Sequence, residues 1–153
     1  MADLTVTITE SLTINSAEIG GTNTKTITGI TDAYKRTITC QNGQETTIAT
    51  FGAQEYSSAG ALDLGDIKYL RVTNIDTTNS VEVAYVLLDG ETAQNFTITV
   101  KAGETHMLYA AEQIAFCEID GAPSFGAMIH IQKIIVRPVE AADVRVELFA
   151  ASV

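Results

Sequence analysis

Apolar and hydroxyl-bearing residues alternate along the start of the chain. The even positions from Leu4 to Ile14 are apolar except for Glu10, and the odd positions from Thr5 to Thr13 are threonine or serine. A period of two residues is that of a β-strand with one buried and one exposed face. The pattern therefore predicts one long strand over residues 4–14, or two strands with a kink near Glu10. A turn is expected at residues 20–23, where two glycines precede Thr and Asn.

Further short segments have the composition of β-strands. They are residues 25–30, 34–41, 45–51, 67–74, 81–88, 96–101, 106–110, 115–119, 129–136 and 144–149. Turn-forming pairs separate most of them, and Asn42-Gly43 between two Thr/Ile runs predicts a hairpin. Residues 52–65 show no strand pattern and are expected to form a long loop, and residues 121–127 a second one. No stretch has a helical period of 3.6 residues over 12 positions.

Many short strands without a helix indicate an all-β fold. We predict an antiparallel β-sandwich of the jelly-roll type, with about 8–11 strands, because the two long loops suit a chain that crosses between sheets. The abundance of threonine, a β-branched residue, favours sheet as well. The length of 153 residues predicts a single domain over residues 1–153.

The charge of the chain narrows the range of partners. Nineteen acidic residues outnumber nine basic ones, which gives a formal net charge of −10. Such a charge opposes binding to nucleic acid and to anionic membranes, and no basic run offers a local exception. The first residues lack the basic start and apolar core of a signal peptide, and no apolar run is long enough for a membrane span. We therefore expect synthesis in a cytoplasm, without nucleic acid or membrane as a partner.

The segment from Asn74 to Asn79 allows two interpretations. Asn74, Asp76 and Asn79 lie within six residues, and oxygen side chains this close can hold Ca²⁺ or can close a turn. The spacing does not match an EF-hand loop, which also needs a glycine and a distal Glu. Asn and Asp close turns by accepting hydrogen bonds from their own backbone. The segment is therefore predicted to be a hairpin turn and not a metal site.

The other residues that could take part in catalysis or metal binding do not form a recognisable motif. His106 and His130 fall in different predicted strands and form no metal-binding motif. Cys40 and Cys117 form no CxxC pair, and free cysteines are usually buried, so two buried thiols are favoured over a disulfide. Asp63 with Asp66, or Glu82 with Glu118, could be proposed as the carboxylate pair of a glycosidase, but surface acids are expected throughout such an acidic chain. We assign no catalytic, metal-binding or cofactor-binding residue, and we do not expect an enzyme.

Two segments resemble a known class of proteins. A strand that ends in Val72-Thr-Asn-Ile-Asp76 is followed by a polar turn and the alternating strand from Val81 to Tyr85. The segment from Phe96 to Glu104, with the sequence FTITVKAGE, then leads into another strand. Together with the threonine-rich start TVTITESLTI, these segments resemble small virion proteins of tailed marine bacteriophages. The resemblance implies a jelly-roll protein of the capsid or tail that forms a trimer or another symmetric oligomer, without catalytic residues.

The threonine-rich strands also suggest how such a protein attaches. A face of threonine is weakly charged, so it can pack against another protein without desolvating charges. The chain termini are apolar as well, which is unusual for free ends. We predict an interface with other copies and with the major capsid protein or another virion protein. Its residues are Leu4, Thr5, Val6, Thr7, Thr9, Thr13, Leu148 and Phe149.

The predicted interface leads to an expected function. The chain is predicted to be a virion protein that decorates or cements a phage head as a symmetric oligomer. One alternative is a tail or fibre module that binds a host glycan or another tail protein, with clustered Tyr, Asp or Asn near residues 52–65 or 120–127. A small β-sandwich hydrolase is the second alternative and requires two carboxylates that converge in a cleft.

Overall fold

The chain folds into strands and connecting loops. The computed structural model describes residues 1–52, 60–89, 92–115 and 128–153, and these contain β-strands and no helix. The prediction of an all-β fold is confirmed. Residues 53–59 of the predicted loop over 52–65, the whole predicted loop over 121–127 and residues 116–119 of the predicted strand over 115–119 lie outside the described residues. The described part of the first segment is not all loop, because Leu62–Asp63 form a short strand.

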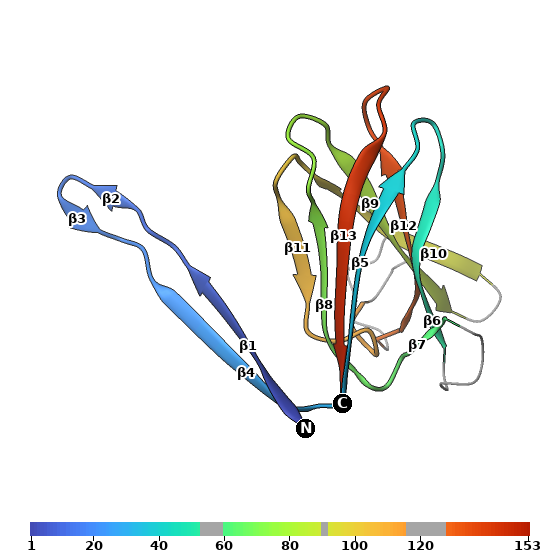
Figure 1. Cartoon of the computed structure of the whole chain (residues 1–153), viewed down its shortest axis with the longest axis horizontal. Coiled ribbons are helices and arrows are strands. Elements are labelled where there is room, and N and C mark those ends of the chain that lie inside the picture. The colour runs from blue at the N-terminus through green and yellow to red at the C-terminus, as the bar shows by residue number, and fades with distance from the viewer. Residues whose placement is uncertain (53–59, 90–91, 116–127) are drawn as a thin grey trace, which may run out of the picture.

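Two parts of the structure are distinct in Figure 1, a sandwich body and an N-terminal arm. The arm contains β1 (Ala2–Thr9), β2 (Thr13–Ile14), β3 (Ala17–Glu18) and β4 (Thr22–Ile30). The body contains β5 (Asp32–Cys40), β6 (Thr46–Gly52), β7 (Leu62–Asp63), β8 (Ile67–Asn74), β9 (Val81–Asp89), β10 (Thr92–Val100), β11 (Thr105–Leu108), β12 (Ile131–Pro138) and β13 (Val144–Ser152). The expected kink near Glu10 is present, since β1 ends at Thr9 and β2 begins at Thr13.

The pairing of the body strands defines a jelly roll. One sheet has the order β11-β8-β13-β5 and the other the order β10-β9-β12-β6, with the short β7 added parallel to β6. The antiparallel pairs are nested: β5 pairs with β13, β6 with β12, β8 with β11 and β9 with β10. A long hairpin rolled into two facing sheets has this nesting, which is the topology of the double Greek key.

Connections between the sheets correct two sequence predictions. The Asn42-Gly43 turn forms, with Gly43 at φ 70° and the Gln44 N–H bonded to the Gln41 carbonyl at 3.1 Å. However, it joins β5 in one sheet to β6 in the other, so the predicted hairpin is wrong. The segment 74–79 likewise carries the chain from β8 to β9 across the sandwich. A turn signal reports local backbone geometry, whereas the pairing partners here are strands far away in the sequence.

The core fills the space between the two sheets. It is built from the inward residues of both sheets, and alternate positions along each strand contribute to it. In β13 the alternation is complete from Val144 through Val146 to Leu148, all without exposed surface. Tyr85 of β9 and Leu70 of β8 are the largest of the fully buried side chains. The described residues of the body therefore form a core between its two sheets.

The arm leaves the body at the end where both chain termini lie. β1 and β4 form a two-stranded antiparallel ribbon that projects away from the sheet containing β13 (Figure 1). Only Thr31 separates β4 from β5, and its N–H donates to the Ser152 carbonyl at 3.0 Å. This short junction fixes where the arm starts on the body.

Candidate assembly surface

The base of the arm is anchored by an apolar cluster on the outer face of the β13 sheet. Tyr69, Ala151 and Ile30 are buried there. Leu4, Val6, Ile27, Met107 and Phe149 pack around them as partly buried side chains. Tyr69 meets the Phe149 ring edge-on with centroids 6.0 Å apart. Leu4 and Val6, two of the five apolar residues of the face predicted for residues 4–14, are thus covered by the protein's own body.

The opposite face of the arm is a ladder of threonines. In the β1–β4 register, Thr5 pairs with Thr26, Thr7 with Thr24 and Thr9 with Thr22. Hydroxyl hydrogen bonds link Thr7 to Thr24 at 3.3 Å and Thr22 to Thr9 at 3.4 Å. Cross-strand threonine pairs stabilise a sheet modestly. They leave a flat, uncharged surface exposed to solvent.

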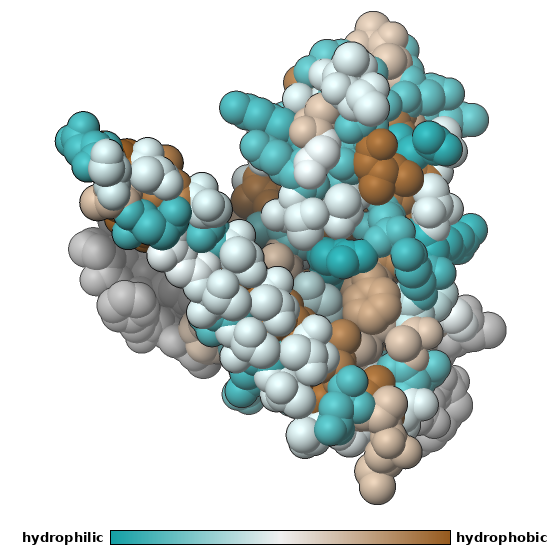
Figure 2. Space-filling view, turned by 60° about the vertical axis from the view of Figure 1, so that its left-hand side comes forward, coloured by the Kyte–Doolittle hydropathy of each residue, from teal (hydrophilic) through white to brown (hydrophobic). Residues whose placement is uncertain are grey.

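The tip of the arm exposes apolar side chains. Leu12, Ile14 and Ile19 are 52%, 47% and 62% exposed. The Ile19 N–H donates to the Leu12 carbonyl at 2.7 Å and Ile14 pairs with Ala17, so the register brings these residues onto one face. Brown, hydrophobic side chains are visible at this end of the arm in Figure 2. The sequence prediction that Leu12 and Ile14 would lie on a buried face is therefore wrong within this chain.

A two-residue turn closes the tip. Asn15 and Ser16 have φ of 51° and 67°, the positive values that a type I′ hairpin turn needs at both central positions. The turn predicted at residues 20–23 is instead the point where the arm bends, between β3 and β4. Asn15 is a residue that tolerates a left-handed conformation, so the signal was present in the sequence without a glycine to mark it.

Gly20 allows the two strands of the arm to approach each other at this bend. A Cβ atom built on Gly20 would lie 2.6 Å from the carbonyl carbon of Glu10 and closer still to its oxygen. No heavy atom lies within 4 Å of a Cβ built on the neighbouring Gly21. The Glu18 carboxylate completes the bend by accepting the N–H groups of Leu12 at 2.9 Å and Gly20 at 2.8 Å. These bonds lower the Glu18 pKa.

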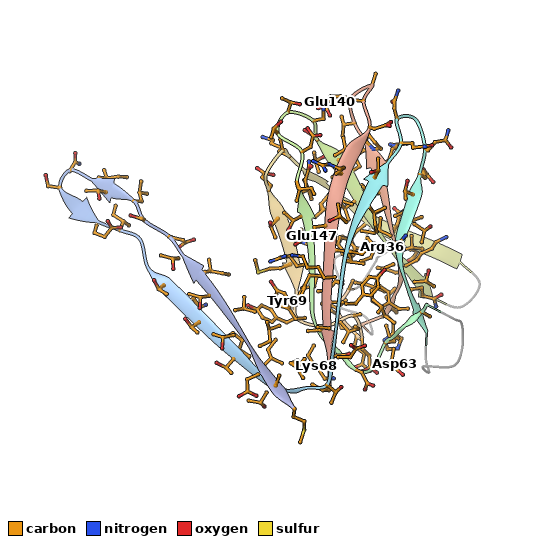
Figure 3. The ribbon with its side chains drawn as sticks, in the orientation of Figure 1. Arg36, Asp63, Lys68, Tyr69, Glu140 and Glu147 are labelled. Carbon is orange, nitrogen blue, oxygen red and sulfur yellow. The ribbon has the colours of Figure 1, made fainter. Side chains whose placement is uncertain are left out.

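A groove of about 480 Å³ lies between the arm and the β13 sheet. Leu4, Val6 and Ile8 line it from the arm, and Tyr69, Met107 and Phe149 line it from the sheet. Its charged lining residues are Lys35 and Arg71. Figure 3 shows Tyr69 and Glu147 on the side of the sheet that faces the arm. The groove is therefore apolar at its floor and basic at its rim.

An ion-pair triad orders that rim. Glu147 bonds to Arg71 on one side and to Lys35 Nζ at 3.0 Å on the other. The Arg71 guanidinium lies over the Phe149 ring, 5.5 Å from its centroid. Lys35, whose hydrogen bond is the largest cause, and then Arg71 hold the pKa of Glu147 below its usual value. Two cations share one carboxylate, so the rim carries a net positive charge.

Glu147 should make the stability of the protein sensitive to acid. The pKa of Glu147 is depressed in the folded state. The ionised side chain therefore stabilises the fold fully above the ordinary glutamate pKa of about 4.3, and this stabilisation is lost as the pH falls through the folded-state pKa. We expect Glu147→Gln to be less stable than the parent at neutral pH and to lose less stability on acidification. Urea unfolding at several pH values between neutrality and acid would measure this.

Glu112→Gln is a matched control, because Glu112 is an exposed carboxylate. It should leave the slope of stability against pH close to that of the parent. Equal slopes for Glu147→Gln and Glu112→Gln would contradict the role given to the triad.

The residues predicted for an interface separate into three groups. Thr5, Thr7 and Thr9 lie on the exposed ladder, and Thr13 lies at the tip, where its hydroxyl donates to Glu18 at 3.1 Å. Leu4, Val6 and Phe149 are partly buried between the arm and the body. Leu148 is fully buried in the core, because it points to the other side of β13 from Phe149. We remove Leu148 from the interface, since no partner can reach its side chain.

Three features of this surface were missed by the sequence prediction. These are Ile19 at the tip, the groove at the base of the arm, and its basic rim. Ile19 stands alone between Glu18 and two glycines and has no strand pattern around it. The groove residues come from β1, β5, β8, β11 and β13, so only the folded chain brings them together.

The connection after β8 is held by its own Asn and Asp side chains, although it crosses between the sheets and is not the predicted hairpin turn. Asp76 Oδ1 accepts the N–H groups of Thr78 and Asn79, both at 2.9 Å, and these bonds lower the pKa of Asp76. The fully buried Asn74 donates to the carbonyls of Asn79 and Val100 at 2.8 and 3.1 Å. Its oxygen accepts the Asp76 N–H at 3.0 Å. Asn74 Oδ1 and Asp76 Oδ1, two of the oxygens considered for Ca²⁺, thus accept backbone N–H groups of the turn.

The remaining candidates for chemistry are dispersed. His106 Nδ1 lies 2.7 Å from the Tyr85 hydroxyl, and burial lowers the His106 pKa and raises that of Tyr85. His130 Nδ1 accepts the Gln113 N–H at 3.1 Å. Cys40 is buried, whereas Cys117 lies outside the described residues. Within the described ranges, no three His, Cys, Asp or Glu side chains are grouped to hold a metal ion.

Of the two carboxylate pairs considered for hydrolysis, the structure brings one to a common hollow and describes only one member of the other. Asp63 and Asp66 line a hollow beside Asp32 near the chain termini, and Asp63 Oδ1 accepts the Gly65 N–H at 3.0 Å. Glu82 is paired with Arg137 on the surface, and Glu118 lies outside the described residues. The second pair therefore cannot be assembled from the residues that are described.

No family model matches the chain, and no curated protein matches its sequence. In the part of the chain that the structure covers, no helix is long and apolar enough to cross a membrane.

Proposed function

We propose that this chain is a structural protein of a bacteriophage virion, which decorates the head as a symmetric oligomer and attaches through its arm. One observation carries the proposal: an arm of about 30 residues projects from a jelly-roll body and exposes apolar residues at its tip. The resemblance of residues 72–85 and 96–104 to phage virion proteins supports the same proposal. Its expected partners are further copies of the chain and the major capsid protein.

The arm is physically incomplete on its own. A two-stranded hairpin is at best marginally stable in water, and its outer edges leave backbone groups unpaired. The tip residues Leu12, Ile14 and Ile19 would gain free energy if another protein covered them. A projecting arm of this kind is suited to assembly, because its flat threonine face and apolar tip can pack on a lattice of neighbours. Many weak contacts of this kind add up on a particle.

The number of copies per particle tests the proposal against its main alternative. A decoration protein is expected in hundreds of copies per particle, and a tail or fibre module in only a few. Quantitative mass spectrometry of purified particles of the phage that encodes the chain measures this number directly. A few copies per particle would favour the alternative of a tail module that binds a host glycan.

Attachment is expected to depend on the bend of the arm. Gly20→Ala places a Cβ against the Glu10 backbone and should force the two strands apart, which would redirect the tip. We expect this variant to reduce binding to particles that lack the protein by at least about tenfold, the size of a hot-spot effect in an interface. Co-sedimentation of the purified chain with particles gives the bound fraction.

Gly21→Ala is the matched control for this variant. It adds the same methyl group one residue later, where no atom lies within 4 Å. It should bind particles as the parent does. Equal binding by both variants, with the arm intact by circular dichroism and proteolysis, would contradict attachment through the arm.

A further inference from the structure

The chain carries two surfaces that remain uncovered and match each other in character. One is the apolar tip with Leu12, Ile14 and Ile19. The other is the groove of 480 Å³ at the base of the arm, with an apolar floor that includes Tyr69 and Phe149. A tip cannot reach the groove of its own chain, because the arm carries it away from the body (Figure 1). Only the tip of a separate molecule can therefore enter this groove.

The charges of the two surfaces are opposite. From residue 8 to residue 23 the arm carries two charged side chains, Glu10 and Glu18, and both are acidic. The charged residues that line the groove are Lys35 and Arg71, and a hollow on β4 at the base of the arm is lined by Lys25 and Lys68. Four of the nine basic residues of the chain thus gather around the arm base. In a chain of net charge −10, this is where an acidic segment can dock.

We propose that the arm tip of one copy docks in the arm-base groove of a second copy. The apolar tip residues cover the groove floor, and the acidic tip meets the rim formed by Lys35 and Arg71. A second copy is the occupant that fits, because the chain itself supplies both the apolar tip and the charge opposite to that of the rim. The biological role of this contact depends on the proposed virion function, whereas its existence does not.

The two docking surfaces are different parts of the molecule, which limits the assemblies that they can form. A contact between unlike patches closes into a ring or a reciprocal pair, or continues as an open chain. The overall negative charge opposes the approach of two copies, so the local attraction at the rim decides the orientation. Because Lys35 is exposed and Arg71 is partly exposed, added salt should weaken the association.

Sedimentation equilibrium of the purified full-length chain tests the proposal. The parent is expected to self-associate within about 1–100 μM, the range of moderate protein–protein affinity. Two variants each remove one surface: Leu12→Ser with Ile19→Ser at the tip, and Lys35→Glu at the groove. Each should weaken self-association by at least about tenfold. Lys101→Glu makes the same charge change at an exposed site outside the groove and should associate as the parent does.

Mixing the two variants distinguishes tip-in-groove docking from other contacts. The groove variant keeps its tip and the tip variant keeps its groove, so the mixture should form a one-to-one complex that neither variant forms alone. Circular dichroism should show that both variants are folded, since the altered side chains are exposed. A monomeric parent, or a mixture without the complex, would overturn the proposed contact. Particle binding is measured separately, so a mixture without the complex would leave attachment to the virion to be judged on its own test, whereas a monomeric parent would also contradict the symmetric oligomer of the proposed function.

Discussion

Replacing Asn74 with alanine is expected to lower the free energy of unfolding by about 2–4 kcal/mol. The Asn74 side chain satisfies three backbone groups at the point where the chain passes from β8 to β9. Alanine would leave two carbonyls and one N–H without these partners. An unsatisfied buried polar group costs about 1–3 kcal/mol, and water can reach only part of this turn. Urea unfolding followed by circular dichroism would measure the loss.

Thr78→Ala is the appropriate control for this variant. Thr78 lies in the same turn, and its exposed hydroxyl donates to Asp76 at 3.2 Å. Because water can replace that bond, we expect a loss below about 1 kcal/mol. If Asn74→Ala and Thr78→Ala had equal effects, the buried amide would not be what fixes this crossing between the sheets.

The sequence was sufficient to predict most body strands but not their partners. Val144, Val146 and Leu148 alternate with charged residues, and this period of two is visible without a structure. Pairing is different, because β5 lies beside β13, which is more than 100 residues away in the chain. The Asn42-Gly43 signal is local, and the hairpin that it predicted does not exist. The jelly-roll fold was predicted from the lengths of two loops. In the structure it is defined by the nested pairing of the strands.

The candidate surface was predictable only in part. The threonine face of β1 follows from alternation, whereas its pairing with the threonines of β4 is known only from the register of the two strands. The same alternation placed Leu12 and Ile14 in a buried face, because periodicity indicates which residues share a side but not whether anything covers that side. The groove could not be predicted at all, since Lys35 and Arg71 come together only through the pairing of β5, β13 and β8.

Leu148→Ala is expected to reduce the free energy of unfolding by about 3–4 kcal/mol, which corresponds to a fall in Tm of roughly 6–15 °C. Leu148 has no exposed surface and lies in the core between the two sheets. Truncation removes its apolar contacts and leaves a cavity, because the flanking strands are fixed by pairing on both sides. Thermal unfolding followed by near-ultraviolet circular dichroism would detect this loss.

Phe149→Ala provides the contrast, because the neighbouring residue points to the other face of the same strand. Phe149 is only partly buried, under the arm and beside Tyr69 and Arg71. We expect a smaller loss of about 1–2 kcal/mol, together with weaker self-association, since Phe149 lines the groove. Leu148→Ala should instead leave self-association unchanged at temperatures where it is folded. The opposite result, a stable Leu148→Ala that fails to associate, would return Leu148 to the interface and would mean that β13 presents its other face to the arm.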